Sequence, residues 1–106
     1  MVKTGEVTYA TRDASVNNVV VKKGQFIGIY NDRLVVSGNL LEETVLQLIR
    51  YLLTEDDELI TIFYGQDVNN EQAEKLRGII LKEFPAVEVE LQYGGQPLYY
   101  YLLSVE

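Results

Sequence analysis

The stretch LITIFYGQDVNNEQAEKLRGIILKEFPAVEVELQY, residues 59–93, decides the fold. Its first six residues are almost all apolar and are followed by glycine, a pattern typical of a buried strand. A helix is expected over 70–84, because Asn69 and Gln72 stand at the spacing of a capping box and a proline prevents its continuation. Apolar and polar residues then alternate over 87–93, which predicts a strand with one dry face. The stretch is therefore a strand–helix–strand unit, with a right-handed crossover if the strands are parallel neighbours.

A second helix is expected directly upstream of this unit. Its apolar stripe consists of residues at helical spacing, Leu41, Val45, Leu48, Ile49 and Leu52. Asn39 is expected to be its N-cap, with Glu42 three residues on as the partner in a capping box. The acidic run 55–58 opposes the negative end of the helix dipole, so the helix is expected to end near Leu53.

Strands are expected on both sides of these helices. Four precede them, over Gly5–Arg12, Val19–Val21, Gln25–Tyr30 and Arg33–Val36. Asn31 and Asp32 tolerate the left-handed backbone of a two-residue hairpin turn, whereas the polar segment Asp13–Asn18 is expected to turn. Gly28 inside a strand indicates a bulge or a close backbone contact.

The C-terminal region completes the expected fold. A Gly-Gly-Gln-Pro turn over 94–97 leads into a final, almost wholly apolar strand over Leu98–Val105. The order is then β-β-β-β-α-β-α-β-β. It predicts an α+β fold (an α/β sandwich), a mixed β-sheet with two helices packed on one face. A length of 106 residues fits a single domain over 1–106.

Composition excludes several kinds of chemistry. The chain contains no Cys, His or Trp, so it offers no disulfide, no thiolate nucleophile and no Ser-His-Asp triad. A metal could be held only by oxygen ligands. The net charge of −7 opposes non-specific binding of nucleic acid. No membrane span is expected, since no apolar run approaches about 18 residues, and no signal-peptide pattern is found, so a cytoplasmic location is expected.

The glycines and carboxylates do not form a recognisable catalytic motif. Neither GxGxxG nor GxxxxGK[ST] occurs, so the usual phosphate cradles are absent from the sequence. The run Glu55–Glu58 lacks the ligand spacing of a calcium loop and is interpreted as solvated surface. Glu88 and Glu90 lie on the polar side of an amphipathic strand. No catalytic, cofactor-binding or metal-binding residue is assigned.

The tyrosines are more informative. The chain has 8 Tyr against 3 Phe. Tyr93, Tyr99, Tyr100 and Tyr101 flank the Gly-Gly-Gln-Pro turn, while Tyr9 and Tyr64 lie near the ends of their strands. Because side chains alternate along a strand, either Tyr100 or both Tyr99 and Tyr101 must face outward. Such tyrosines are either padding of an amphipathic strand or a surface that docks a partner.

The chain resembles the C-terminal domain of the bacterial dihydroxyacetone-kinase-like proteins that are the kinase subunit of fatty acid kinase. The segments that carry the resemblance follow in the same order along nearly the whole chain: GEVTYATRD (5–13), KKGQFIGI (22–29), DELITIFYGQDV (57–68) and YGGQPLYYYLLSVE (93–106). One departure is Tyr100, where members of the family usually carry Pro.

The resemblance implies a division of labour within a larger kinase. The parent protein would be an ATP-dependent fatty acid kinase, with ATP and magnesium bound by its kinase domain and no cofactor in the present domain. The C-terminal domain would help to engage a DegV-type fatty-acid-binding protein, whose bound fatty acid is phosphorylated to an acyl phosphate. Exposed aromatics and motif position then select the expected contact residues, Tyr93, Gln96, Pro97, Tyr99 and Tyr101, with Arg12 and Asp13 as a polar rim.

Two other functions remain open at this point. The chain could bind a small apolar (acyl) ligand between its helices and its sheet, which an apolar pocket of a few hundred Å³ would favour. Alternatively, it could be a phosphotransferase or phosphatase fragment with its own activity, although the metal, positioning groups and charge stabilisation that phosphoryl transfer needs cannot be located in the sequence.

Overall fold

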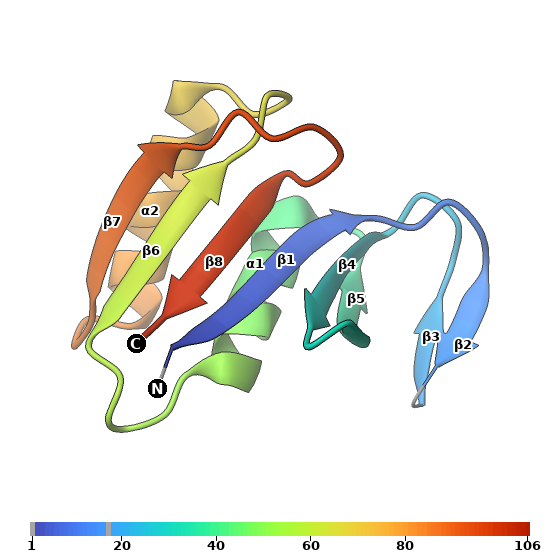
Figure 1. Cartoon of the computed structure of the whole chain (residues 1–106), viewed down its shortest axis with the longest axis horizontal. Helices are drawn as coiled ribbons and strands as arrows, with labels where there is room; N and C mark the ends of the chain where they lie inside the picture. Colours follow the sequence, from blue (N-terminus) through green and yellow to red (C-terminus); the bar gives the residue numbers. More distant parts are fainter. Residues whose placement is uncertain (1, 17) are drawn as a thin grey trace.

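The computed structural model describes residues 2–16 and 18–106, and it shows a six-stranded mixed sheet, two helices and a separate two-stranded hairpin (Figure 1). In chain order the elements are β1 (Lys3–Tyr9), β2 (Ala14–Val16), β3 (Val19–Val21), β4 (Phe26–Tyr30), β5 (Arg33–Gly38), α1 (Leu41–Leu52), β6 (Leu59–Tyr64), α2 (Asn70–Glu83), β7 (Glu88–Tyr93) and β8 (Tyr101–Val105). The α+β class and the order of strands and helices are confirmed, with β2 as one further short strand.

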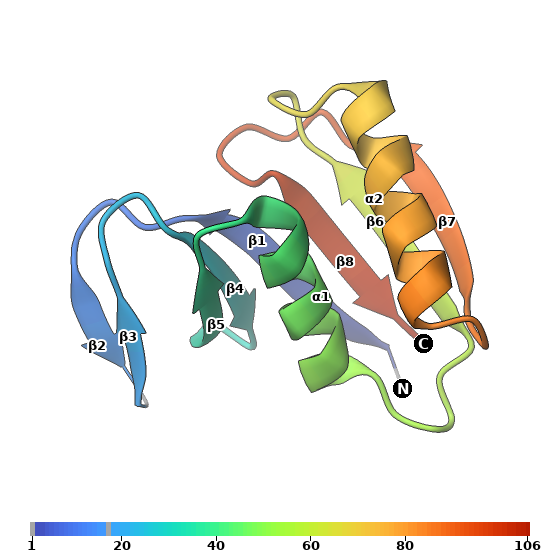
Figure 2. The same cartoon turned by 180° about the vertical axis from the view of Figure 1, so that it is seen from behind.

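The large sheet has the strand order β5-β4-β1-β8-β6-β7. Only β6 and β7 are parallel to each other; the other neighbours are antiparallel. Both helices cover one face of this sheet (Figure 2). In Figure 1, α2 lies behind the sheet and β7 lies to the left of β6 while both strands point upward, so the crossover is right-handed as expected.

One hydrophobic core fills the space between the helices and the sheet. Its fully buried members come from every layer, among them Val7, Val45, Leu48, Ile49, Ile60, Ile62, Leu76, Ile80 and Leu103. Neither described helix has the length and apolar composition needed to cross a membrane.

Several local signals act as the sequence predicts. Asn69 accepts a hydrogen bond from the backbone N–H of Gln72 (2.8 Å), and the Gln72 side chain accepts one from the Asn69 N–H (3.0 Å), so the capping box of α2 is confirmed. Asn31 and Asp32 have φ values of 52° and 62° between β4 and β5, which confirms the two-residue hairpin. α1 ends with Leu53 as its C-cap, as the acidic run predicts.

The bulge that Gly28 indicates is confirmed, and the close contact at this residue is with side chains of β5 and α1. The pairing of β4 with β5 shifts register between Gly28 and Ile29, which marks a bulge. A Cβ at Gly28 would lie 2.5 Å from Cγ2 of Val36. Only glycine therefore lets β5 and the underlying helix approach this strand so closely.

The expected capping box of α1 is wrong. The N-cap is Leu40, which makes no side-chain cap hydrogen bond. The Asn39 side chain instead accepts a hydrogen bond from Nε2 of Gln25 (2.8 Å), a residue distant in sequence. The Thr44 hydroxyl donates to the carbonyl oxygen of Leu40 (2.8 Å) within the first turn.

The expected turn over Asp13–Asn18 is also wrong in part. Ala14–Val16 form β2, which pairs with β3 in antiparallel register, Ala14 opposite Val21 and Val16 opposite Val19. Asn17 lies outside the described residues. The first strand spans Lys3–Tyr9 rather than Gly5–Arg12. It starts earlier because Lys3 pairs with Val105 on β8, and beyond the hydrogen bond from the Ala10 N–H to the carbonyl oxygen of Gln25 (2.8 Å) the chain leaves the sheet for the hairpin.

Candidate docking surface

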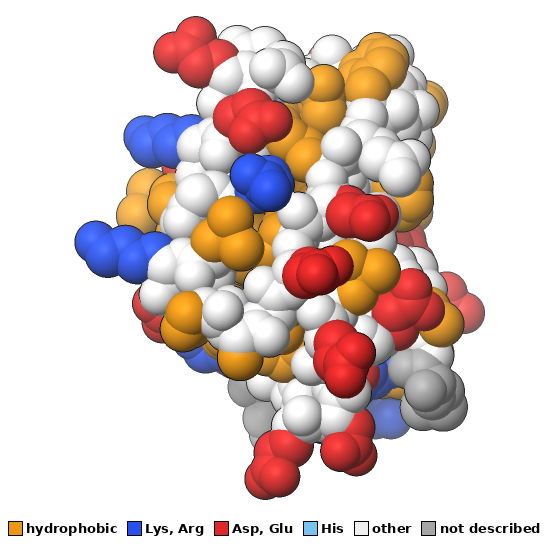
Figure 3. Space-filling model, turned by 90° about the vertical axis from the view of Figure 1, so that its left-hand side faces the viewer, with side chains coloured by type: hydrophobic (Ala, Val, Ile, Leu, Met, Phe, Trp, Pro, Cys, Tyr) orange, Lys and Arg blue, Asp and Glu red, His pale blue; other side chains and the backbone are white. Residues whose placement is uncertain are grey.

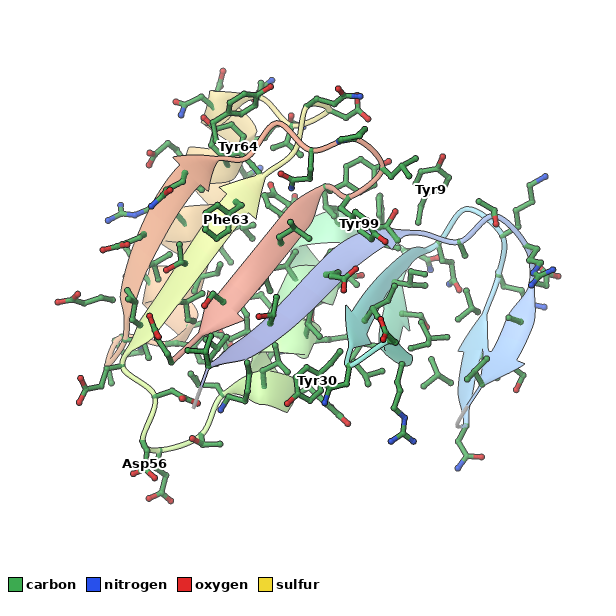
Figure 4. The ribbon with its side chains drawn as sticks, in the orientation of Figure 1. Tyr9, Tyr30, Asp56, Phe63, Tyr64 and Tyr99 are labelled. Carbon is green, nitrogen blue, oxygen red and sulfur yellow. The ribbon has the colours of Figure 1, made fainter. Side chains whose placement is uncertain are left out.

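Four strand ends meet at one end of the large sheet and bring the tyrosines together. β1, β6 and β7 end there and β8 begins there (Figure 1). Tyr9 and Tyr64 lie at these ends and Tyr99 lies in the loop between β7 and β8, whereas Tyr30 lies at the other end of the sheet (Figure 4). We call this region the tyrosine edge and define it by Tyr9, Tyr64, Tyr93, Leu98, Tyr99 and Tyr100.

The loop between β7 and β8 is fixed to the sheet by backbone hydrogen bonds. The N–H groups of Gly94 and Gly95 both donate to the carbonyl oxygen of Tyr64, at 2.9 and 3.1 Å. The Gly65 N–H donates to the carbonyl oxygen of Tyr100 (2.8 Å), and the Gln66 N–H donates to that of Gln96 (3.1 Å). The end of β6 thus holds both ends and the middle of the loop.

Gly65 is the point at which the loop comes closest to β6. A Cβ at this position would lie 2.2 Å from the carbonyl oxygen of Tyr99 and 2.8 Å from that of Gln96. Both are backbone atoms, so a side chain at Gly65 would displace the loop itself. The glycine that ends the buried strand in the sequence is therefore required for the contact between strand and loop.

Gln96 holds the loop in place. Its Nε2 donates to the carbonyl oxygens of Phe63 (3.0 Å) and Tyr99 (3.4 Å), and the residue is half-buried. Gln96 is among the expected contact residues, but its amide nitrogen points inward and connects β6 to the start of β8. It is therefore a residue that positions the exposed side chains beside it.

The fixed loop displays apolar side chains to solvent. Leu98 is 69% exposed and Tyr93 is 64% exposed. Leu98 has a φ of 73°, an uncommon backbone conformation for a leucine. Its carbonyl oxygen accepts a hydrogen bond from the Thr8 hydroxyl (2.6 Å), which fixes this turn to β1. The loop therefore presents Leu98 in one defined place.

The rings of the tyrosine edge form two packed groups. The ring centroids of Tyr64 and Tyr93 are 5.2 Å apart. Tyr100 lies 5.6 Å from Phe26 and 6.2 Å from Tyr9, measured between ring centroids. Ring pairs at these distances stabilise each other and restrict rotamers. The exposed ring of Tyr93 is thus supported from beneath, as an anchor in a protein interface requires.

Tyr101 cannot belong to a contact surface, contrary to the expectation. It lies opposite Val7 and Tyr64 in the sheet and faces the helices, with 1% of its surface exposed. Burial, with a smaller effect of the Glu42 charge, raises the pKa of Tyr101 to about 12. Its phenol is therefore a neutral part of the core. Of the three consecutive tyrosines, Tyr99 and Tyr100 are half-buried and precede β8, which starts only at Tyr101.

The expected polar rim lies elsewhere. Arg12 and Asp13 are exposed in the connection between β1 and β2, on the side of the molecule away from β7 (Figure 1). The Asp13 carboxylate accepts a hydrogen bond from the Lys23 N–H (2.8 Å) and so closes the base of the hairpin. The structure therefore brings Tyr93, Gln96, Pro97 and Tyr99 together in the loop and places Arg12 and Asp13 at the base of the hairpin, beyond Tyr9.

Sequence reasoning misses Leu98 as a surface residue. The run from Leu98 to Val105 is almost wholly apolar, which predicts that Leu98 lies inside the last strand. The preceding Gly-Gly-Gln-Pro turn is the available signal that the loop could extend further.

The cavities described within residues 2–16 and 18–106 lie at the surface and not between the helices and the sheet. The four described cavities are lined by surface segments and by none of the fully buried core residues. The cavity of about 410 Å³ between the ends of the two helices has apolar walls from Leu53 and Phe84, but Glu55, Asp57 and Glu83 also line it. Two of these carboxylates are paired with cations, Asp57 with Lys3 and Glu83 with Arg50. The cavity lies at the ends of the helices and not between the helices and the sheet, where the acyl ligand is expected.

The acidic run does not form a metal site. Within residues 2–16 and 18–106, no three Asp or Glu side chains lie where they could share a metal ion. Asp57 accepts a hydrogen bond from Nζ of Lys3 (2.5 Å) and from the Thr54 N–H (2.7 Å). The ammonium group of Lys3 and then the Thr54 N–H hold the pKa of Asp57 below its usual value. This carboxylate therefore fastens β1 to the segment before β6.

The geometry defines a class of protein: a small α+β domain that presents fixed apolar side chains at one end of its sheet. Comparison with known proteins identifies the family. Residues 1–106 match the family of FakA-like C-terminal domains of fatty acid kinase, and the chain belongs to this family.

The relatives are much longer proteins. An uncharacterized protein of Staphylococcus haemolyticus (strain JCSC1435) is 44% identical over 105 residues, which is 99% of this chain and 19% of the relative. An uncharacterized protein of Staphylococcus aureus (strain USA300) is 40% identical and protein YloV of Bacillus subtilis (strain 168) is 37% identical, with the same coverage. The chain thus spans about a fifth of the length of these relatives.

Proposed function

We propose that this chain is the non-catalytic docking domain of a cytoplasmic fatty acid kinase. It engages a DegV-type fatty-acid-binding protein and holds that carrier near the kinase active site, where the bound fatty acid is phosphorylated to an acyl phosphate. ATP and magnesium belong to the kinase domain of the parent protein. A tethered module of this kind acts by raising the effective concentration of the carrier.

One observation carries the proposal: the loop between β7 and β8 is fixed by hydrogen bonds while Tyr93 and Leu98 remain exposed. Tyrosines in well-packed surroundings are enriched among the residues that dominate binding energy. A loop that is already ordered loses little conformational entropy when a partner binds. Family membership supports the same role, because the matched family is the C-terminal part of a larger kinase protein.

Calorimetric titration of this chain with the cognate carrier tests the proposal. We expect Tyr93→Ala and Leu98→Ala each to raise the Kd by about tenfold or more, as truncation of interface anchors does. Tyr51→Ala is the matched control, because Tyr51 is 57% exposed but lies at the far end of α1. Its Kd should stay within about twofold of the unmodified chain. Absence of heat at high micromolar concentrations, or an equal loss in Tyr51→Ala, would contradict the proposal.

A further inference from the structure

The charge of this chain is distributed unevenly. Residues 10–38 contain four Lys or Arg and two Asp or Glu, a net charge of +2. The rest of the chain contains five Lys or Arg and fourteen Asp or Glu, a net charge of −9. Figure 3 shows acidic side chains gathered on the β7 side of the molecule, which faces away from the hairpin. Residues 10–38, which we call the positive region, therefore carry a net charge opposite to that of the rest of the chain.

The positive region is built on the projecting hairpin of β2 and β3, which we call the arm and define as residues 11–16 and 18–24. Arg12, Lys22 and Lys23 are exposed on it, and so are the apolar side chains Val16 and Val20. Within the part of the chain that the structure describes, none of these three cations is in a salt bridge.

The arm is held in a defined position relative to the sheet. The Gly24 N–H donates to the carbonyl oxygen of Ala10 (2.8 Å) at its base. The Ser37 hydroxyl on β5 donates to the carbonyl oxygen of Val20 (3.2 Å). A two-stranded hairpin gains its stability from such packing. The cations are therefore presented at fixed places rather than on a free segment.

A groove connects the arm to the tyrosine edge. It has a volume of about 180 Å³ and lies between the arm and the open face of the sheet. Val21, Ile27 and Leu34 give it an apolar floor, and Arg12 and Tyr9 also line it. Tyr9 belongs to the tyrosine edge, where it packs against Tyr100. The two surfaces are thus continuous through one residue.

We propose that the arm is a second, electrostatic part of the docking surface, and that it receives an acidic patch of the same partner protein with an apolar side chain that enters the groove. This inference rests on the proposed function. The acidic body repels an acidic partner, whereas the arm attracts it, so the charge distribution admits the partner in one orientation. The exposed valines and the apolar groove floor favour a protein surface.

Other polyanions fit this surface less well. Nucleic acid and anionic membranes extend beyond the arm and would meet the negative charge of the body. The arm offers three cations and one acidic side chain, Asp13, which is few for a phosphate backbone. A compact acidic patch needs only the area of the arm.

Stopped-flow association of this chain with the carrier tests the inference at low and high salt. We expect the double variant Lys22→Glu/Lys23→Glu to lower kon by about tenfold at low salt and to flatten its salt dependence, as reversal of steering charges does. Lys75→Glu/Lys82→Glu is the matched control. It changes the net charge equally, but both lysines are exposed on α2, so a small change in kon is expected.

The outcomes separate the two proposals. Equal effects of the two double variants, or a kon for the unmodified chain that rises with salt, would overturn the role of the arm while leaving docking through the tyrosine edge intact. Competition by tRNA, or binding to anionic vesicles that Lys22→Glu/Lys23→Glu abolishes, would assign the arm to those partners and overturn the inference. Failure of the unmodified chain to bind the carrier at all would refute the proposed function, and the inference with it.

Discussion

Replacing Gln96 by Ala should loosen the loop that carries Tyr93 and Leu98. The change removes one hydrogen bond of 3.0 Å to the Phe63 carbonyl and a longer one of 3.4 Å to the Tyr99 carbonyl. A typical hydrogen bond contributes a net of about 1 kcal/mol, and a half-buried acceptor left without its donor adds to the loss. The expected cost is about 1–2 kcal/mol. Because the loop is near the surface, part of this cost should appear as local opening.

Two measurements detect this loss. Urea denaturation reports the global part as a lower free energy of unfolding. In a thermal scan, each kcal/mol lost from a chain of this size corresponds to a fall in Tm of about 4–8 °C. Native-state hydrogen exchange reports the local part at the Gly94, Gly95 and Gly65 amides, whose bonds hold the loop. Each decrease of about 1.4 kcal/mol in the free energy of local opening should speed exchange at these amides about tenfold. The amides within β8, a core strand, should change only by the global part of the loss.

Gln96→Glu makes the test more selective. Its carboxylate would face the carbonyl oxygens of Phe63 and Tyr99 and could donate to neither, so at pH 7 this variant should be less stable than Gln96→Ala. The pKa of the new carboxyl should lie above its unfolded value, because only the protonated form can donate. Its stability is then retained at low pH and lost as pH rises through the folded pKa. If both variants match the unmodified chain in stability, exchange and carrier affinity, Gln96 does not position the loop.

Three further predictions concern other contacts. Gly65→Ala should lower the free energy of unfolding by about 1–3 kcal/mol, because the new Cβ would meet two backbone oxygens. Gly78→Ala places its Cβ where nothing lies within 4 Å, so it should stabilise α2 by up to about 1 kcal/mol. Urea denaturation of both variants would show whether close approach is the cause of the loss at Gly65. Asn69→Ala should cost about 1 kcal/mol by loss of the capping box, and a free energy of unfolding equal to that of the unmodified chain would show that the cap is dispensable. Asp57→Asn should lower the free energy of unfolding by about 1 kcal/mol at pH 7. Because the folded pKa of Asp57 is lowered, the difference in stability between the variant and the unmodified chain should disappear as pH falls through that pKa. A difference that persists in acid would mean that packing, and not the charge of Asp57, is its cause.

The elements that the sequence predicts well are those whose signals are local. The cap of α2 needs only Asn69 and Gln72, and the β4–β5 turn needs only Asn31 and Asp32. The apolar alternation of β7 also lies within a few residues. These features depend on interactions between neighbours, so they need no knowledge of the tertiary fold.

Two of the errors, at Asn39 and Tyr101, come from contacts between residues distant in sequence, and the third concerns a local hairpin. Asn39 has the right character for a cap, but Gln25 binds its side chain from another strand. Ala14–Val16 become a strand because β3 pairs with them and Lys23 closes the hairpin on Asp13. Tyr101 faces inward because its register with Val7 and Tyr64 places it there. The partners of Asn39 and Tyr101 lie outside any short window of sequence, whereas β2 pairs with the nearby β3, and the polar character of residues 13–18 hides that pairing.

The candidate site shows the same division. The cluster of tyrosines and the Gly-Gly-Gln-Pro turn locate the correct end of the sheet. They do not reveal that Gln96 points inward or that Leu98 points outward, since both depend on where Gly65 and β1 contact the loop. Motif position alone assigns Arg12 to the rim, whereas the structure places it on the arm.

The way the loop is fixed bears on how tightly such a domain can bind. Ordering one residue costs about 1–2 kcal/mol of backbone entropy, so ordering residues 94–100 during binding would cost on the order of 7–14 kcal/mol. A complex with a nanomolar Kd has only about 12 kcal/mol of net binding free energy. A disordered loop of this length could therefore offset most of what the interface supplies. Hydrogen bonds already order this loop in the free domain, so its conformational entropy is lost on folding and not on binding. The donors are Gly65, Gln66, Gly94, Gly95 and Gln96, and burial of the hydrophobic core offsets the entropy loss during folding. Affinity should consequently follow the integrity of these bonds as closely as it follows the exposed side chains themselves.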